Sequence, residues 1–345
     1  MATITRYSPG ESTDALHAVW QATFGADPVR ALAAAKIHEL LNYPTARVYI
    51  AAVSDEVVGW ALTYTIRSGC EPDAKSQHLR GGLGALLVHP SHQNQGIGSA
   101  LHSVAITELE IAVRNSFGLS TPPPDKGSIQ LGSVFPRIFP GVPDTPREVA
   151  FFKNRGWDMS ARESDLYGAL PTAANLEQFT APAEEKGVSF RPATAGDRVE
   201  LIVMEYAEFG EYCGWPDLYP VFFDAGRQAD LHLAVRGGKI IGATIAAMPG
   251  SPAHERLAFP DSLGTVPCQA RLISGNACSV VACVGVGAAA RGSGAGVGMT
   301  AAAIADLTRR GADGVFIDWV NMRGFYERFG VAEWWGYITA SRVVR

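Results

Sequence analysis

The same order of sequence features occurs twice in this chain of 345 residues. Residues 47–64 and 231–248 each contain two apolar, β-branched runs separated by a short polar break. Gly59 and Gly242 fall at equivalent places in the second run of each pair. Runs of this length with Ser-Asp-Glu or Gly-Gly between them predict β-hairpins. An internal repeat of this size restricts the fold to two similar units in tandem, as the length also favours.

Each predicted hairpin is followed by an apolar strand, a glycine-rich turn and a helix. We place these elements at residues 84–88, 93–98 and from about Ser99 in the first half, and at 280–286, 291–298 and 299–309 in the second. Each half then has an aromatic pair shortly before a glycine, Phe151-Phe152 and Phe325-Tyr326. The repeat predicts an α/β protein with one domain over residues 1–170 and another over residues 189–345.

The segment between the two predicted domains, residues 171–188, is rich in Pro, Ala and Glu, which is typical of a linker. Each half also contains an insertion, Thr121 to Pro146 in the first and Pro249 to Pro267 in the second. Long loops inside compact domains are commonly functional, so both insertions are candidate walls of a substrate pocket.

Composition excludes several classes of protein. Apolar residues make up 47% of the chain and charged residues 18%, which supports packed cores, and the net charge of −5 disfavours a nucleic-acid partner. The five cysteines are scattered without metal spacing and no signal peptide precedes the repeat, so we expect no metal and a cytoplasmic location. Leu272 to Ala290 has no charged residue, but its Val- and Cys-rich middle favours a buried strand over a membrane helix.

The segment that begins at Val88 carries the clearest chemical signal. A strand ends there, Pro90 stops it, and small and amide residues lead into a helix N-terminus. Such a turn directs several backbone N–H groups to one point, where the helix dipole also favours negative charge. Gly96 and Gly98 allow a diphosphate to approach the backbone closely. Neither the dinucleotide fingerprint nor a Walker ending is present.

This segment resembles the coenzyme A pyrophosphate loop of the GNAT superfamily, whose pattern is V-x-P-x-x-(Q/R)-x-x-G-x-(G/A). Every specified position is met, and the second copy keeps R-x-x-G-x-G with Ala288 at the proline position. The resemblance covers nearly the whole chain and implies acetyl-coenzyme A as co-substrate, without a metal. The residues expected to bind the coenzyme are Leu87, Val88, Gln93, Asn94, Gln95, Gly96, Ile97, Gly98 and Ser99 in the first half, and Val286, Arg291, Gly292, Ser293, Gly294, Ala295 and Gly296 in the second.

The resemblance also implies direct transfer of an acetyl group to an amine in a ternary complex. A carboxylate removes a proton from the amine, a strand N–H polarises the thioester, and a tyrosine protonates the departing thiolate. Tyr326 stands at the tyrosine position in the second half, whereas the first half has Phe152, which cannot donate a proton. A helix aromatic packed in the core is the alternative for Tyr326.

A base is harder to identify. Asp318 ends an apolar strand eight residues before Tyr326 and is our candidate, with a helix-capping role as the alternative. Glu205, Glu208 and Glu211 recur every three residues; they could line an amine pocket, but the spacing favours a solvated helix face.

The expected function is therefore transfer of an acetyl group to a primary amine of a small molecule, for example an amino sugar. The rival hypothesis is a protein that binds acyl-coenzyme A without turnover, as a sensor. We expect neither a nucleic-acid nor a membrane partner, and the sequence leaves a monomer and a homo-oligomer both open.

Overall fold

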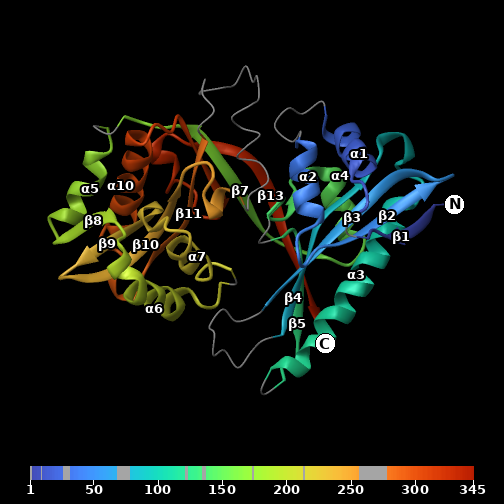
Figure 1. Ribbon diagram of the computed structural model, residues 1–345, viewed down its shortest axis with the longest axis horizontal. Helices are drawn as coiled ribbons and strands as arrows, with labels where there is room; N and C mark the ends of the chain where they lie inside the picture. Colours follow the sequence, from blue (N-terminus) through green and yellow to red (C-terminus); the bar gives the residue numbers. More distant parts are fainter. Residues whose placement is uncertain are drawn as a thin grey trace.

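The computed structural model describes residues 2–8, 10–25, 32–67, 78–120, 123–133, 137–172, 175–212, 214–255 and 278–345. It has two lobes, one built mainly from each half of the chain (Figure 1). Two long strands, β7 (Asp158–Ala169) and β13 (Ala332–Val344), run between the lobes. Helices pack on both faces of a mixed sheet, which confirms the predicted α/β class.

Both halves follow the predicted order of elements. The remaining elements of the first half are β1 (Thr3–Arg6), α1 (Asp14–Phe24), α2 (Ala34–Leu41), β2 (Arg47–Val53), β3 (Glu56–Arg67), β4 (Leu79–Val88), α3 (Ile97–Asn115), β5 (Gly127–Leu131), β6 (Val142–Pro143) and α4 (Pro146–Lys153). Those that follow β7 are α5 (Glu177–Glu184), β8 (Val188–Pro192), α6 (Arg198–Phe209), α7 (Leu218–Asp224), β9 (Leu231–Arg236), β10 (Lys239–Ala247), α8 (Pro252–Glu255), β11 (Cys278–Val286), α10 (Ala295–Arg309) and β12 (Gly314–Val320).

The two predicted hairpins are confirmed, as β2–β3 and β9–β10. Their turns are made by Ser54-Asp55, with φ of 49° and 66°, and by Gly237-Gly238, with φ of 60° and 77°. Two consecutive residues with positive φ are what a type I′ turn requires, and its twist matches that of the flanking strands. Turn chemistry therefore sets the register of both hairpins.

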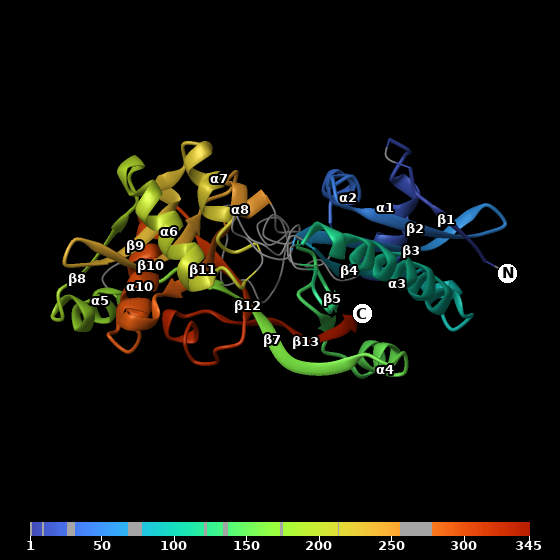
Figure 2. The same ribbon diagram turned by 90° about the horizontal axis from the view of Figure 1, so that it is seen from below.

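Alternating side chains divide each half into two cores. Along the first hairpin, Val48 and Trp60 pack with α1 and α2, whereas Tyr49 and Ala61 pack with α3. Figure 2 shows these helices on opposite sides of the sheet. In the second half, α6 and α7 cover one face and α10 covers the other. The period of two along a strand produces this separation.

The two halves exchange their last strands. In the sheet, the order is β1-β2-β3-β4-β5-β13-β7-β12-β11-β10-β9-β8. The C-terminal strand β13 therefore pairs with β5 of the first half, and β7 of the first half pairs with β12 of the second. The sequence repeat divides at residues 170–189, but backbone hydrogen bonds join the halves on both sides of that division.

The segment predicted as a linker contains helix α5. Its residues Leu176 and Ala183 are buried, and the ring of Phe179 lies 5.2 Å from that of Phe329. Apolar residues at this spacing form a helical stripe that packs against the second half. Part of the segment is thus structural rather than a simple connection.

The uncharged stretch from Leu272 is a strand where it is described, from Cys278 to Val286, and residues 272–277 lie outside the described part. Within the described ranges, none of the helices is long and apolar enough to cross a membrane. Cys278 and Cys283 are free thiols, and the other three cysteines lie outside the described residues.

Candidate active site

The first glycine-rich loop follows β4. After Val88 the chain makes a short 3-10 turn, Pro90–His92, and α3 then begins at Ile97, two residues before the predicted start. Gly96 precedes the helix with φ of 83°, and the side-chain amide of Gln93 donates to the carbonyl oxygen of Val88 at 2.9 Å. This side chain ties the loop back to the end of the strand.

The second loop has the same conformation. A 3-10 turn, Ala288–Ala290, follows β11, and α10 begins at Ala295, four residues before the predicted start. Gly294 has φ of 90°, and Nε of Arg291 donates to the carbonyl oxygen of Val286 at 3.2 Å. Replacement of the proline by Ala288 therefore leaves the turn unchanged.

Both loops form a backbone cradle suited to an anion. Asn94 and Gly96 in the first loop have positive φ, as do Gly292 and Gly294 in the second. Successive residues of this kind turn their N–H groups to one side, beside a helix N-terminus whose first N–H groups have no partner in the helix. A side chain added at Gly96 would meet nothing within 4 Å, so the space that a diphosphate needs is open there.

The cations around the two loops differ in what they bind. Arg147 donates to the side-chain oxygen of Gln93 at 2.6 Å, and Arg155 donates to the hydroxyl of Ser99. At the second loop, the ammonium of Lys186 lies 3.4 Å from the carbonyl oxygen of Ser293. With Arg291, each loop thus has two cations nearby, but those of the first loop, Arg147 and Arg155, bind side chains of the loop itself.

Next to each loop, two parallel strands separate. Strand β4 pairs with β5 only over Gly81–Leu83, and β11 pairs with β12 only over Cys278–Val281. Beyond Val281, the backbone groups of β11 that face β12 have no partner on that strand. We refer to this place, where β11 and β12 no longer pair, as the slot of the second half.

Beneath the separated strands of the first half lies a group of aromatic side chains. The ring of Trp20 lies 6.0 Å from that of Trp60 and 6.2 Å from that of Phe139, and both pairs are stacked. Trp20 and Trp60 are fully buried. Packed rings thus occupy this part of the first half.

In the second half, a carboxylate takes the place of that tryptophan. Helices α1 and α6 both end in Phe-Gly, and four residues before the phenylalanine stand Trp20 and Glu205, respectively. Glu205 is fully buried, which corrects the sequence-based preference for a solvated face. Of the other two glutamates, Glu208 accepts the N–H of Ala288 at 2.7 Å, and Glu211 is exposed.

Glu205 is poised to exchange a proton. Burial raises its pKa to about 8, although nearby Tyr219 and Trp215 lower it in part. Nε1 of Trp215 donates to its Oε2 at 3.1 Å, while its Oε1 has no hydrogen-bond partner among the described residues. The hydroxyl of Tyr219 donates to the carbonyl oxygen of Cys283, two residues beyond the last ladder pair of β11. Through Tyr219, Glu205 therefore lies close to the slot of the second half.

A buried ion cluster lies beside the end of β12. Arg137, from the Pro-rich insertion of the first half, pairs with Asp165 at 3.2 Å and with Asp318. Its guanidinium also lies 5.0 Å from the ring centre of Trp319. The first-half insertion thus contacts β12 directly after its last pair with β11.

The two predicted catalytic residues both lie close to the slot: Asp318 directly follows the last pair of β12 with β11, and Tyr326 lies near Cys283. Asp318 is engaged by Arg137, and its role as base stays a prediction. Tyr326 is 7% exposed, and burial together with the charge of Cys283 raises its pKa well above 10. No hydrogen bond joins its hydroxyl to another described residue, so the proton stays available for donation.

Sequence analysis did not identify Arg137 or Asp165. Asp165 directly precedes an uncharged, largely apolar run, Leu166 to Leu170, and Arg137 is a single cation among prolines and phenylalanines. Buried charges are normally paired, so the sequence could have predicted that each of these two residues forms an ion pair. Their partners could not be named, because Arg137 and Asp318 are 181 residues apart.

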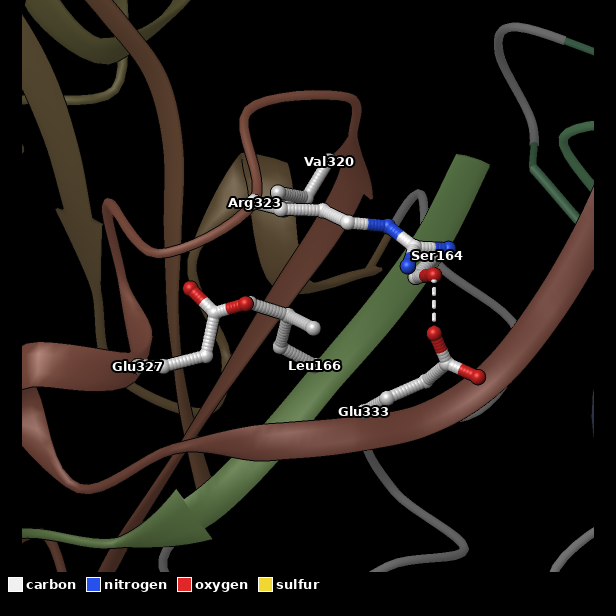
Figure 3. Close-up of a pocket in the computed structure, with 6 residues that line it drawn as sticks. All are labelled: Ser164, Leu166, Val320, Arg323, Glu327 and Glu333. Atoms are coloured by element: carbon white, nitrogen blue, oxygen red, sulfur yellow. Dashed lines mark hydrogen bonds between the residues drawn. The ribbon is translucent and has the colours of Figure 1, made fainter. Parts of the chain in front are cut away.

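A separate small pocket lies between β7, β12 and β13 (Figure 3). It has a volume of about 110 Å³ and is lined by Ser164, Leu166, Val320, Arg323, Glu327 and Glu333. Glu333 accepts from Ser164 at 2.6 Å and from Arg162, and these bonds lower its pKa to about 2. Its carboxylate is therefore held in an ion pair and a hydrogen bond. Among the described residues there is also no group of His, Cys, Asp or Glu side chains that could hold a metal ion.

Comparison with known proteins agrees with this geometry. Residues 13–131 match the acetyltransferase (GNAT) family model, and the search of curated proteins found no match. A similar solved structure is the GCN5-related glucosamine N-acetyltransferase region of a fungal multi-domain β-N-acetylglucosaminidase, with 26% identity over 99% of this chain and a TM-score of 0.80. This chain spans 38% of the length of that protein.

Two further solved structures share the fold over the whole chain. A GCN5-related N-acetyltransferase from Sphaerobacter thermophilus has 14% identity and a TM-score of 0.68, covering 100% of this chain and 96% of its own. A tandem GNAT protein from the clavulanic acid biosynthesis pathway has 15% identity and a TM-score of 0.56, covering 100% and 99%. The family match, the two glycine loops and the shared fold together assign the chain to the GNAT superfamily of acetyltransferases, as a tandem two-domain member.

Proposed function

We propose that the protein is an acetyl-coenzyme A-dependent N-acetyltransferase whose second half acetylates a primary amine of a small, amino-sugar-like molecule. The observation that carries this proposal is Glu205, a buried carboxyl group close to the slot between β11 and β12. The first half, with Trp20 at the equivalent position, has no such group.

Glu205 would act as the general base. An amine attacks only in its neutral form, and a base works best when its pKa lies near the working pH. With a pKa of about 8, Glu205 gains its charge in the range where many amines begin to lose their proton. Asp318 is less suited to this role because the guanidinium of Arg137 neutralises it.

The remaining groups fit the thioester side of the reaction. Bound acetyl-coenzyme A would supply the activated acetyl group. The loop from Arg291 to Gly296 would hold its diphosphate, and an unpaired N–H of β11 beyond Val281 would donate to the thioester carbonyl. Tyr326 keeps its proton at neutral pH and would donate it to the departing thiolate.

The charge of the cleft favours a cationic acceptor. Arg137 is surrounded by Asp165 and Asp318 as well as by Glu163, a buried carboxyl group whose pKa is raised to about 7 by burial. Once Glu163 ionises, at a pH of about 7 and above, the acidic groups outnumber this one cation, and their field then attracts an ammonium group. The similar fungal region is described as a glucosamine N-acetyltransferase, so an amino sugar is the first acceptor to test.

The first half supports a different role. Its loop has the proline, two glycines and two nearby arginines, yet the space beneath its strands is filled by Trp20, Trp60 and Phe139. We propose that the first half binds the coenzyme without turnover. For this half, the proposal agrees with the hypothesis of a protein that binds acyl-coenzyme A as a sensor.

The test measures thiol release from acetyl-coenzyme A with glucosamine, other amino sugars, aminoglycosides and a lysine peptide. We expect glucosamine-like amines to be the best acceptors, with kcat/KM rising with pH through about 8 as Glu205 ionises. Glu205→Gln should lower kcat by ~100-fold or more, because a positioned base contributes about that factor.

The matched control is Glu211→Gln, which removes an exposed carboxylate just beyond the end of the same helix and should leave kcat unchanged. Coenzyme binding without amine-dependent thiol release across the panel would refute the catalytic proposal. Equal loss in both variants would remove Glu205 from the role of base.

A further inference from the structure

Strand β12 contains an irregularity at the entrance to the second slot. Its pairing with β7 runs through Ile317 and resumes at Val320, with a register shift between them. Within this bulge, Trp319 has φ of 51°, a left-handed conformation that is unfavourable for a bulky residue. A conformation of this kind persists only where neighbouring groups hold it.

Three contacts hold the bulge. The N–H of Trp319 donates to Oδ1 of Asp165 at 2.9 Å, and the same oxygen accepts from Arg137 at 3.2 Å. The guanidinium of Arg137 also binds the carboxylate of Asp318 and lies over the indole of Trp319. Arg137 and Asp165 are 4% and 2% exposed, so water does not compete for these bonds.

The bulge directs β12 away from β11. Asp318 and Trp319 directly follow Ile317, the last residue of β12 that pairs with β11. In the first half, the residue after the last such pair is Gly132, with φ of 94°. Glycine adopts that conformation without support, whereas Trp319 depends on the cluster.

Both supporting residues come from the other half of the chain. Arg137 lies in the segment after β5, and Asp165 lies on β7. We propose that Arg137 is a positioning residue: its ion pairs with Asp165 and Asp318 hold the β12 bulge and thereby keep the coenzyme slot of the second half open. The first half is then an obligatory part of the second half's coenzyme site, an inference that rests on the proposed function.

Arg162 provides the matched comparison. It too joins the two halves, with Nε 2.6 Å from Asp144 and NH2 2.6 Å from Glu333. Unlike Arg137, it is 31% exposed and does not contact the bulge. Loss of Arg162 therefore tests a bond between the halves that does not support the slot.

The experiment titrates coenzyme A itself into the full-length protein by calorimetry. A Gly96→Asp background blocks the first loop, so that only the second site is measured. In this background we expect Arg137→Lys, which keeps the charge but loses the two-pronged bridge, to raise the coenzyme Kd at least ~10-fold. Arg162→Gln should change the Kd less than ~2-fold, as expected for an exposed pair.

Steady-state kinetics add a second readout. Arg137→Lys should raise the KM for acetyl-coenzyme A by a similar factor and leave the KM for the amine within ~2-fold of its original value. Arg137→Gln should have a larger effect, and Arg137→Lys alone decides if the glutamine variant does not fold. A further variant, Arg137→Gln/Asp318→Asn, removes the bridge and leaves Asp165, which still accepts the N–H of Trp319, as the one carboxylate of the cluster; a Kd that stays raised supports the role of the bridge, and a normal Kd contradicts it.

An unchanged Kd for coenzyme A and an unchanged KM for acetyl-coenzyme A in Arg137→Lys would overturn the inference. This holds even if the melting temperature of the variant is lower. The binding measurement does not depend on turnover, so a protein that binds coenzyme A but acetylates no amine would contradict the proposed function and still test Arg137. Absence of coenzyme binding in the Gly96→Asp background would overturn both.

Discussion

The two halves share one architecture but differ in what lies beneath their separated strands. The first half has Trp20 packed against Trp60 and Phe139, and the second half has the buried Glu205 at the equivalent position. The first loop has the proline of the family pattern, whereas the second half has the buried carboxyl group that we propose as the base. Under this proposal the two copies have different roles, and neither copy alone describes the whole molecule.

The proposed difference between the two halves is tested most directly by blocking one coenzyme loop at a time. Gly96 and Gly294 have φ of 83° and 90°, which aspartate tolerates better than most residues, and its charge would repel a diphosphate. We expect Gly294→Asp to lower turnover at least ~100-fold, equivalent to about 2.7 kcal/mol of binding. Gly96→Asp should remove one coenzyme per chain with a change in turnover below ~3-fold. Turnover rates and the number of coenzymes bound per chain measure both effects. A larger loss of turnover in Gly96→Asp than in Gly294→Asp would place catalysis in the first half.

A smaller effect is expected at the proposed acid. Tyr326→Phe removes the hydroxyl and keeps the ring packing, so kcat should fall ~10- to 100-fold, with little change in either KM. The converse change in the first half, Phe152→Tyr, should not raise or lower kcat. Full activity of the Tyr326 variant at neutral pH would leave this residue with a packing role only.

The smallest expected effect is a pH-dependent change in stability when Glu205 is replaced. The pKa of Glu205 is raised from 4.5 to about 8 by burial, so the unfolded chain releases this proton at lower pH than the folded protein. The protonated group is therefore favourable below pH 4.5, and that stability is lost as the pH rises to about 8. Glu205→Gln should raise the melting temperature at pH 8.5 by several degrees relative to wild type, with less gain at pH 5. A similar gain at both pH values would contradict the titration.

Local sequence signals explain which parts of the fold could be predicted. The hairpins followed from turn residues and from alternation, and both loops followed from their glycines. The helix starts were placed late, because Gly96–Gly98 and Gly294–Gly296 weaken the helical signal although they belong to the loop-to-helix transition.

Long-range features could not be predicted in this way. No feature of its sequence identifies β5 as the partner of strand β13, and a helix with several glutamates such as α6 does not reveal that Glu205 is the buried one. Arg137 depends on a residue 181 positions away. These features are set by tertiary packing, which pattern and propensity do not encode.

The strand exchange has a consequence for the order in which the protein can be made. Strand β13 spans Ala332–Val344, late in the second half, and yet it completes the sheet of the first half beside β5. Domains generally begin to fold from the N-terminus while synthesis continues. Here β5 lacks its antiparallel partner until residues 332–344 have been synthesised, so the first half completes its sheet only together with the second half.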